Sequence, residues 1–154
     1  MKNIIVLSDT HGNKKAIDSI AKQLIEVDCV FHLGDVRQDA EYIKRQYNKN
    51  VVSVLGNCDF GASEEIVEIE KVKFMLCHGH MYSVKMGLNS LISAAKEKGV
   101  DACFFGHTHE ALKEEVDGLT LINPGAMSSS YAPMSYCFVT VVNDKFFSKI
   151  VSIK

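Results

Sequence analysis

Short apolar runs alternate with amphipathic segments through the first part of the chain. Residues 3–7, 29–33 and 50–55 are runs of β-branched and other apolar residues, a pattern typical of buried strands. Residues 14–26 and 38–47 instead place apolar side chains three and four positions apart, which predicts a helix in each segment. Strands that alternate with helices in this way predict parallel βαβ units.

The middle of the chain departs from this alternation. Residues 65–70 and 72–77 lie too close together to be joined by a helix, so we expect an antiparallel hairpin. A helix is expected over residues 85–98 and is closed by Gly99. The strand that follows ends at Gly106.

Two more hairpins are expected near the carboxyl end. One covers residues 111–122 and turns at Asp117-Gly118, and the other covers residues 136–153. A Ser-rich loop, residues 127–134, separates them, and its Ser128–Ser130 stretch is a candidate wall of a substrate pocket. The predicted architecture is α/β: two β-sheets packed face to face, helices on the outside, and the loops that follow strands gathered at one edge.

Composition favours one domain of modest size. The chain has 154 residues, of which 47% are hydrophobic and 23% charged, enough for one well-buried core but not for two. We therefore expect a single domain over residues 1–154. The net charge of −2 and the isoelectric point near 6.3 give no basic field, so generic nucleic-acid binding is not expected.

Two further features favour a cytoplasmic protein. The apolar run after Met1 is too short for a signal peptide, and no stretch reaches the length of a membrane span. The five cysteines are scattered, odd in number and without a C-x-x-C motif, which favours reduced thiols. The sequence leaves a homo-oligomer open.

The stretch from Asp101 to Glu110 contains the clearest candidate for metal binding. Its apolar run ends at Gly106 and then presents His107 and His109 one residue apart. We expect Gly106 to adopt backbone angles that a side chain would forbid, so that the chain turns sharply and the two imidazoles converge. Imidazoles held together at the end of a strand favour a metal site.

An apolar strand followed by a side chain of a kind that binds metals recurs in four other places. Five of the six histidines fall in three of the strand-end loops. We expect these loops to gather at one edge of the sheets, where strands end. The candidate ligands, in chain order, are Asp9, His11, Asp35, Asn57, His78, His107 and His109.

Several of these residues have a simpler interpretation when taken alone. Asp9 fits a turn or helix-cap carboxylate, and Asn57 lies in a Gly-Asn pair that is common in turns. His32 lies inside its strand, so we interpret it as a packed core histidine and leave it out of the site. Arg37 opens a predicted helix near Asp35 and is interpreted as solvated, with contact to an anionic substrate as the alternative.

The chemistry of the candidate set indicates which metals it suits. It combines hard oxygen ligands with imidazole nitrogens, which suits Mn, Fe, Zn, Ni or Co. Calcium would require oxygen ligands throughout, and a structural zinc site would usually contain thiolates. Seven candidates exceed the needs of one tetrahedral ion. They suit two ions that share a bridging carboxylate and lie about 3.5–4 Å apart, as in two-metal hydrolytic sites.

Five motifs in order give the chain a resemblance to a known family. The motifs are Asp9-x-His11, Gly34-Asp35, Gly56-Asn57, His78 and Gly106-His107-x-His109. They resemble the calcineurin-like metallophosphoesterase superfamily, and the short chain with Gly-Asn-Cys-Asp, His-Gly-His and Asn-Pro-Gly is similar to its small YfcE-like phosphodiesterase branch. The resemblance implies a four-layer αββα sandwich with a metal site at the carboxyl ends of strands. It also implies a division of the ligands: Asp9, His11 and His109 on one ion, Asn57, His78 and His107 on the other, and Asp35 as the bridge.

The resemblance further implies a metal-dependent phosphoesterase, and most directly a phosphodiesterase. Two divalent ions, Mn foremost and Ni, Zn, Fe or Co as alternatives, would activate a water for in-line attack on the phosphorus of a phosphate-ester substrate. One alternative is a protein-interaction scaffold of the same fold, like the small subunit of the retromer coat. Another is a metal-stabilised domain without catalysis.

Cys58 is a departure from the family pattern. Members with Gly-Asn-His use that histidine to assist the leaving group, and this chain has Cys58 in its place. A thiol is a poorer acid than an imidazolium near neutral pH. Cys58 and His80 are therefore the two candidate catalytic residues. His80 could act as a proton donor, as a phosphate contact, or only as support for His78.

Overall fold

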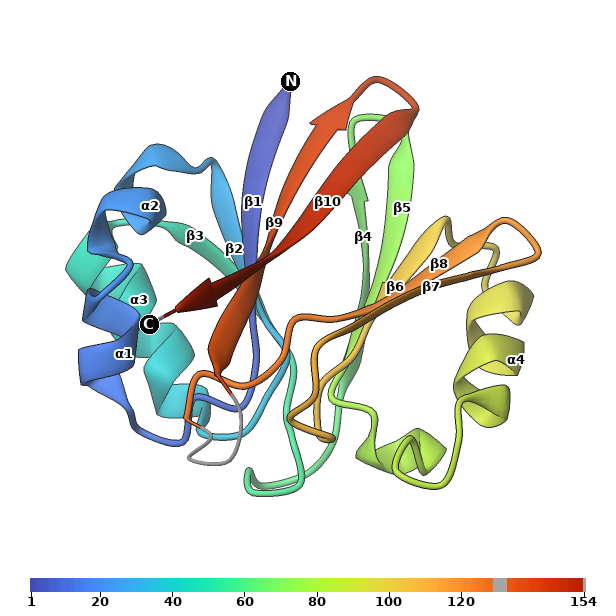
Figure 1. Ribbon diagram of the computed structural model, residues 1–154, viewed down its shortest axis with the longest axis horizontal. Coiled ribbons are helices and arrows are strands. Elements are labelled where there is room, and N and C mark those ends of the chain that lie inside the picture. Colours follow the sequence, from blue (N-terminus) through green and yellow to red (C-terminus); the bar gives the residue numbers. More distant parts are fainter. Residues whose placement is uncertain (129–132, 154) are drawn as a thin grey trace.

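Two mixed β-sheets form the centre of the molecule and lie face to face between helices (Figure 1). The computed structural model describes residues 1–128 and 133–153. Within these residues each sheet has five strands, in the orders β10-β9-β1-β2-β3 and β4-β5-β6-β8-β7. The expected α/β class and the pair of packed sheets are confirmed.

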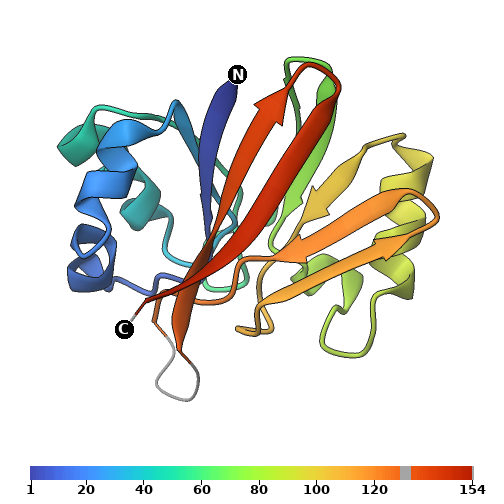
Figure 2. The same cartoon turned by 45° about the horizontal axis from the view of Figure 1, so that its top comes forward.

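The first sheet is organised around β1 (Lys2–Leu7). This strand pairs in parallel with β2 (Cys29–His32), which pairs in parallel with β3 (Asn50–Ser53). On its other side β1 pairs antiparallel with β9 (Met134–Val142), the first strand of a hairpin with β10 (Lys145–Ile153). Figure 2 shows this long hairpin crossing the front of the molecule beside β1.

The second sheet joins two hairpins to a central strand. β6 (Ala102–Phe104) pairs in parallel with β5 (Val72–Cys77) on one side and with β8 (Leu119–Asn123) on the other. β4 (Glu64–Ile69) and β7 (Leu112–Val116) are the outer strands, antiparallel to β5 and β8. The hairpins expected from the sequence are therefore present.

Helices cover the outer face of each sheet (Figure 1). α1 (Lys14–Asp18), α2 (Ala21–Glu26) and α3 (Arg37–Tyr47) lie on the first sheet, and α4 (Asn89–Glu97) lies on the second. A short 3₁₀ helix, η1 (His80–Tyr82), follows β5. No helix in the described part of the chain is both long and apolar enough to cross a membrane.

Buried side chains from both sheets fill the space between them. Successive residues of a strand point to opposite faces, and Ile4 and Val6 of β1 point toward the second sheet. There they join a cluster of three rings, those of Phe31, Phe74 and Phe104, whose centroids lie 5.4 to 6.1 Å apart. This layer fixes the two sheets against each other.

Two outer clusters attach the helices. Ile5, the residue between the two inward positions of β1, packs with Ile17 and Leu24 of the first helices. Met75 of β5 packs with Leu91 of α4. The order of layers is therefore helix, sheet, sheet, helix, which confirms the four-layer αββα sandwich.

The helix expected over residues 14–26 is divided into α1 and α2. The Ser19 hydroxyl donates to the carbonyl of Ala16, and such a bond competes with the helical backbone. Ile20 has φ of −110° and ψ of 26°, outside the helical range. Helical periodicity continues across the break, which is why the pattern predicted one helix.

The helix expected over residues 85–98 begins later, at Asn89. Gly87 has φ of 139°, a conformation that glycine adopts at little cost and that a helix cannot contain. Gly99, with φ of 65°, follows the end of the helix as expected. Of the expected Ser-rich loop, residues 129–132 lie outside the described residues.

Candidate metal centre

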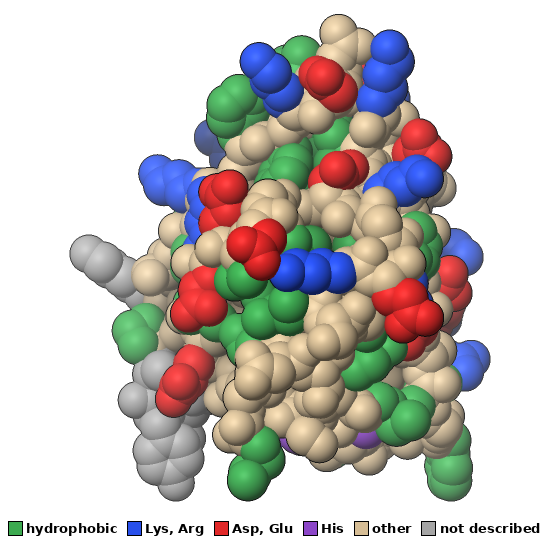
Figure 3. All heavy atoms as spheres, turned by 90° about the vertical axis from the view of Figure 1, so that its right-hand side faces the viewer, with side chains coloured by type: hydrophobic (Ala, Val, Ile, Leu, Met, Phe, Trp, Pro, Cys, Tyr) green, Lys and Arg blue, Asp and Glu red, His purple; other side chains and the backbone are tan. Residues whose placement is uncertain are grey.

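The loops that follow β1, β2, β3, β5 and β6 meet at one edge of the molecule (Figure 1). Backbone hydrogen bonds connect them: the Asp9 N–H donates to the Gly34 carbonyl at 3.1 Å, and the Gly106 N–H donates to the His78 carbonyl at 2.8 Å. Figure 3 shows imidazoles reaching the surface at this edge, below a face on which acidic and basic side chains are interspersed. The edge therefore draws on both sheets.

Asp9 is buried and held by one of its two carboxylate oxygens. Oδ2 accepts hydrogen bonds from the Ser8 hydroxyl at 2.6 Å and from the His107 N–H at 3.0 Å. Oδ1 is buried and has no hydrogen-bond partner within the described residues. It lies 3.1 Å from Nε2 of His109 and 3.7 Å from Nε2 of both His11 and His78. One oxygen is thus anchored while the other faces three imidazoles.

Asp35 likewise has one oxygen held by a hydrogen bond and one oxygen that faces imidazoles. Its Oδ1 accepts the Cys58 N–H at 2.9 Å. Its Oδ2 lies 3.4 Å from His11 Nε2 and 3.5 Å from His78 Nε2. Burial alone would raise the pKa of Asp35, but the Cys58 N–H and the imidazoles of His78 and His11 outweigh it and hold the pKa below its usual value. The group is a carboxylate at neutral pH.

The tautomer of His78 follows from its hydrogen bond to the backbone. Nδ1 lies 2.8 Å from the carbonyl oxygen of Leu33, an acceptor, so Nδ1 carries the proton. Nε2 of the neutral ring then presents a lone pair toward Asp9 and Asp35. This orientation, with one nitrogen fixed by a backbone carbonyl, is common for histidine ligands of metals.

The donor atoms fit a bound cation. Asp9 Oδ1 and His78 Nε2 are both buried acceptors without a hydrogen bond in the described part of the chain. Buried polar atoms are rarely left unpaired, and two lone pairs repel each other unless a cation or a proton lies between them. Within the described residues, three overlapping groups each bring three possible ligand atoms within 4.8 Å of one another: Asp9, His11 and His109; His11, Asp35 and Cys58; Asp9, Asp35 and His78.

One side of this group is open to solvent. The side chains of Asp9 and His78 are completely buried, whereas those of His11 and His109 are 32% and 39% exposed. A structural metal site is closed by protein ligands, and a catalytic site keeps a position for substrate. The uneven exposure therefore favours a site that a substrate can reach.

Glycines precede several candidate ligands because the loops approach too closely for a side chain. A Cβ on Gly106 would lie 2.0 Å from Ser8 Oγ and 2.7 Å from Asp9 Oδ2. A Cβ on Gly56 would lie 2.2 Å from Asp35 Oδ1. The expected reason for Gly106, a backbone angle forbidden to other residues, is wrong: its φ is not positive, and lack of space is what requires glycine.

The unusual backbone angles belong to the candidate ligands themselves. Left-handed φ values are uncommon outside glycine and cluster at functional sites. They are found at Asp9 (54°), His11 (46°), Asp35 (61°), His107 (70°) and His109 (63°). The fold holds five of the seven candidates in this conformation, and four of them, Asp9, His11, Asp35 and His109, belong to the groups of possible metal ligands.

The other candidates lie at the border of the group. The His107 ring lies 5.1 Å from that of His78 and 6.1 Å from that of His80, centroid to centroid. The Asn57 side chain is exposed and donates to Cys58 Sγ at 3.8 Å. Among the described residues, no hydrogen bond or ion pair joins the Asn57 side chain to the other candidate ligands.

The two candidate catalytic residues lie on different sides of the centre. Cys58 is exposed, and its Sγ belongs to the group with His11 and Asp35. Partial desolvation of its thiol and the nearby Asp35 carboxylate raise the pKa of Cys58, so it is a thiol at neutral pH. His80 is half-buried beside His78, and burial together with the His78 imidazole lowers the pKa of His80. Its Nδ1 is buried without a hydrogen-bond partner among the described residues.

His32 and Arg37 are placed as the sequence led us to expect. His32 is completely buried, its Nε2 lies 2.9 Å from Thr10 Oγ1, and its Nδ1 accepts the Gly34 N–H at 3.3 Å. Burial lowers the pKa of His32, so the ring is neutral. It supports the two loops that carry Asp9 and Asp35. Arg37 is exposed at the start of α3.

Two residues that support the ligand loops were not identified from the sequence. The Asp59 carboxylate accepts N–H bonds from Asp35 at 3.1 Å, Gly56 at 2.9 Å and Arg37 at 2.8 Å, and so joins two ligand loops. Its place in the turn Gly-Asn-Cys-Asp was the available signal, because carboxylates often accept backbone N–H groups in turns.

The second missed residue is Asn123, in the Asn-Pro-Gly turn at the end of β8. Its Nδ2 donates to the Gly106 carbonyl at 3.1 Å and to Thr108 Oγ1 at 2.9 Å. Its Oδ1 accepts the Gly125 N–H at 2.9 Å. Asn123 is completely buried. It therefore fixes the loop that carries His107 and His109.

Proteins of similar sequence and fold are known. The chain is 32% identical over 148 residues to Probable metallophosphoesterase YsnB of Bacillus subtilis, an alignment that covers 92% of this chain and 86% of the relative. It is also 32% identical over 144 residues to Phosphodiesterase MJ0936 of Methanocaldococcus jannaschii, with 78% of this chain and 81% of the relative covered.

A solved structure with the same fold is Vacuolar Protein Sorting 29 from Cryptosporidium parvum. It superposes with a TM-score of 0.84 over 99% of this chain and 92% of that chain, at 21% identity, a likeness of fold alone. Residues 1–144 match the calcineurin-like phosphoesterase superfamily domain. With this match and the 32% identity to YsnB, the chain belongs to the calcineurin-like phosphoesterase superfamily.

Proposed function

We propose that this protein is a metal-dependent phosphodiesterase that uses two divalent ions. The observation that carries the proposal is the pair of buried, unpartnered acceptors Asp9 Oδ1 and His78 Nε2, which face each other across 3.7 Å within the described residues. A cation resolves their repulsion, and the solvent-exposed side of the centre gives a phosphate ester access to it.

The ligand distances support a division between two ions. Asp9, His11 and His109 would hold the first, since Asp9 Oδ1 lies 3.1 Å and 3.7 Å from Nε2 of His109 and His11. Asp35 would bridge, because its Oδ2 is nearly equidistant from His11 and His78, at 3.4 and 3.5 Å. His78, His107 and Asn57 would hold the second ion.

Mn is our first choice of metal, and Ni, Zn, Fe or Co would suit the same mixture of imidazoles and carboxylates. Divalent ions bound there would supply an activated water nucleophile and would stabilise charge on the phosphoryl oxygens. The chain's own contribution is positional. Ser8 and the His107 N–H orient Asp9, the Cys58 N–H orients Asp35, and the Leu33 carbonyl orients His78.

Leaving-group assistance is assigned to Cys58 or His80. Both are beside the centre, Cys58 near His11 and Asp35, and His80 near His78. Cys58 is a protonated thiol and a weak acid at neutral pH. We propose that the enzyme turns over good leaving groups far faster than poor ones, because a thiol and not an imidazolium occupies the position of Cys58.

We further propose that residues 1–154 form one domain. The family match extends over residues 1–144, and one apolar layer joins the two sheets. An interaction scaffold of the same fold is the alternative, and the shared fold with Vacuolar Protein Sorting 29 does not favour it. A scaffold has no need of buried, unpartnered ligand atoms around one point.

The test is a panel of phosphate monoesters and diesters with purified apo protein reloaded with Mn, Ni, Zn or Mg. We expect metal-dependent hydrolysis of bis(4-nitrophenyl) phosphate, fastest with a transition ion, and none with Asp35→Ala. Activity that is equal in the presence of a chelator would contradict a metal-dependent mechanism. No turnover of any ester with any metal would favour the scaffold.

A further inference from the structure

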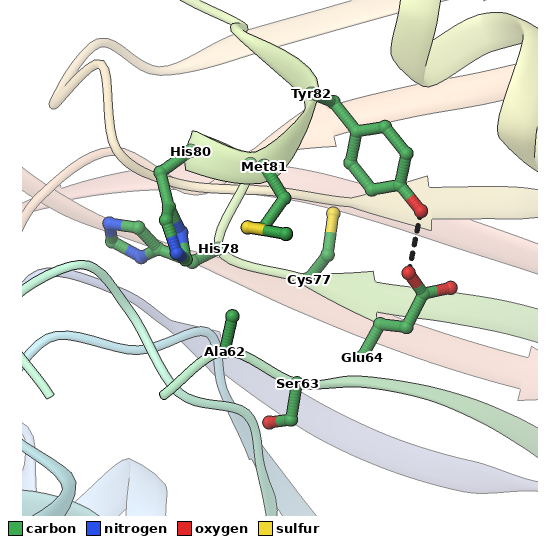
Figure 4. A pocket seen from close by; sticks show the side chains of 9 residues that line it. Ala62, Ser63, Glu64, Cys77, His78, His80, Met81 and Tyr82 are labelled. Atoms are coloured by element: carbon green, nitrogen blue, oxygen red, sulfur yellow. Dashed lines mark hydrogen bonds between the residues drawn. The ribbon is translucent and has the colours of Figure 1, made fainter. Parts of the chain in front are cut away.

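A pocket of about 370 Å³ lies directly beside the candidate metal centre (Figure 4). The loop before β4, the end of β5 and η1 form its walls. His78 and His80 lie at one end of the pocket, and Glu64 and Tyr82 lie at the other. The pocket therefore leads away from the place where a phosphoryl group would bind.

The wall between the two ends is largely apolar. Figure 4 shows the Met81 and Cys77 side chains on one side and Ala62 on the other. Cys77 is buried, whereas Met81 is 69% exposed at the mouth of the pocket. The volume falls within the range of small-molecule sites and is sufficient for a phenyl-sized group.

The far end of the pocket carries the carboxylate of Glu64. The Tyr82 hydroxyl donates to Glu64 Oε1, and Lys98 Nζ lies 3.5 Å from Glu64 Oε2. Burial and the Glu64 carboxylate raise the pKa of Tyr82, so the phenol remains a donor. Lys98 offsets part of the Glu64 charge, but it does not line the pocket, so the described wall presents the carboxylate and not the ammonium.

We propose that this pocket receives one of the two ester groups of a phosphodiester and selects an uncharged, largely apolar group over an anionic one. The inference rests on the proposed phosphodiesterase function and adds a substrate preference to it. The apolar wall favours burial of carbon. The Glu64 carboxylate disfavours a second negative charge at the far end of the pocket, such as a further phosphate or a carboxylate.

Two diesters of the same shape test the charge preference. Both are 4-nitrophenyl phenyl phosphates, one with a para carboxamide on the phenyl ring and the other with a para carboxylate. With Mn-loaded wild-type protein, kcat/KM should favour the carboxamide on the order of tenfold. Glu64→Gln should bring this ratio close to one, mainly by faster turnover of the carboxylate ester.

Glu65→Gln is the matched control. Glu65 is the next residue of β4, is exposed, and points to the opposite face of the strand. Its replacement removes the same charge from the same strand but not from the pocket, so the ratio should remain at the wild-type value. A ratio that fell equally in both variants would show a general charge effect and would overturn the inference.

Occupancy of the pocket is tested with Met81→Trp. Met81 is exposed, so the substitution leaves the core intact while it fills the mouth of the pocket. It should slow the 4-nitrophenyl phenyl diester several-fold relative to the methyl 4-nitrophenyl diester. The pocket assignment would be overturned if Met81→Trp left the ratio of phenyl to methyl diester rates unchanged. It would also be overturned if Glu64→Gln left the carboxamide-to-carboxylate ratio of kcat/KM unchanged. In either case, hydrolysis itself would still support the proposed function. Absence of metal-dependent hydrolysis in the wild type would overturn both.

Discussion

Asp9 Oδ1 and His78 Nε2 lie 3.7 Å apart, both buried and both without a hydrogen-bond partner among the described residues. One comes from the loop after β1 in the first sheet, and the other from the loop after β5 in the second. The pair therefore lies where the two sheets meet, at the edge of the molecule that is open to solvent. A ligand that binds between them would therefore stabilise the whole fold.

The first prediction is that metal raises the melting temperature. A ligand that binds only the folded state at 100 times its Kd adds about 2.7 kcal/mol to the free energy of unfolding. For a chain of this size that corresponds to roughly 5–10 °C. Differential scanning calorimetry of apo protein with and without Mn measures the shift. His78→Ala should lose most of it, and identical melting of apo and Mn-treated wild type would contradict the account.

The second prediction ranks the ligands. Asp35→Ala should be the most damaging single change, because it removes negative charge from both proposed ions. His109→Ala should weaken the binding of one ion only, and this variant should regain part of its activity in excess Mn. His32→Gln, the control, replaces a core histidine and should keep its metal. Elemental analysis of metal-saturated variants measures the bound metal per chain. Loss of metal from His32→Gln with retention in Asp35→Ala would contradict the assignment of Asp35 as a ligand and of His32 as a core residue.

The third prediction concerns Gly106. Gly106→Ala places a methyl group against Ser8 and Asp9, so it should lower the free energy of unfolding by about 1–3 kcal/mol and displace the Asp9 carboxylate. Gly99→Ala is the matched control: its φ is 65° and its Cβ would meet nothing within 4 Å, so backbone strain of about 1 kcal/mol is its only cost. Urea unfolding gives the stabilities, and calorimetric titration with Mn gives the affinities. Equal Mn affinity in both variants would contradict the role of Gly106.

The fourth prediction concerns Cys58. A histidine at this position could protonate a departing alkoxide, which a thiol does poorly. Cys58→His should accelerate the hydrolysis of alkyl esters more than that of nitrophenyl esters. It should therefore reduce the difference in rate between the two, which we expect to be of the size of general acid catalysis, roughly 10² to 10⁴-fold. Cys58→Ser should change little. The measurement is the slope of log rate against leaving-group pKa, and an equal slope in wild type and Cys58→His would assign the proton donor elsewhere, most directly to His80.

The sequence indicated candidate metal ligands because these residues occupy a recognisable position, just after an apolar strand. Asp9, Asp35, Asn57, His78 and His107 each follow the end of an apolar strand within a few residues. Parallel strands bring such ends to one edge whatever the details of packing. The two-sheet architecture followed from the same periodicity, because each apolar run needs a face to pack against.

Contacts between distant segments could not be predicted in this way. Asp59 and Asn123 support ligand loops through hydrogen bonds between segments that lie far apart in the sequence, and their sequence positions indicate only turns. The Glu64–Tyr82 pair, which closes the pocket, joins β4 to η1 across 18 positions. The break at Ser19 depends on one side-chain bond to the Ala16 carbonyl, within a segment whose periodicity remains helical.

One titration shows whether the hydrolytic centre holds two metal ions. Apo protein receives Mn in steps, and bound Mn per chain and the rate of bis(4-nitrophenyl) phosphate hydrolysis are measured at each step. We expect binding to saturate at two ions per chain and activity to rise with the second ion. Saturation at one ion with full activity, or full activity before any Mn is bound, would contradict a two-metal centre.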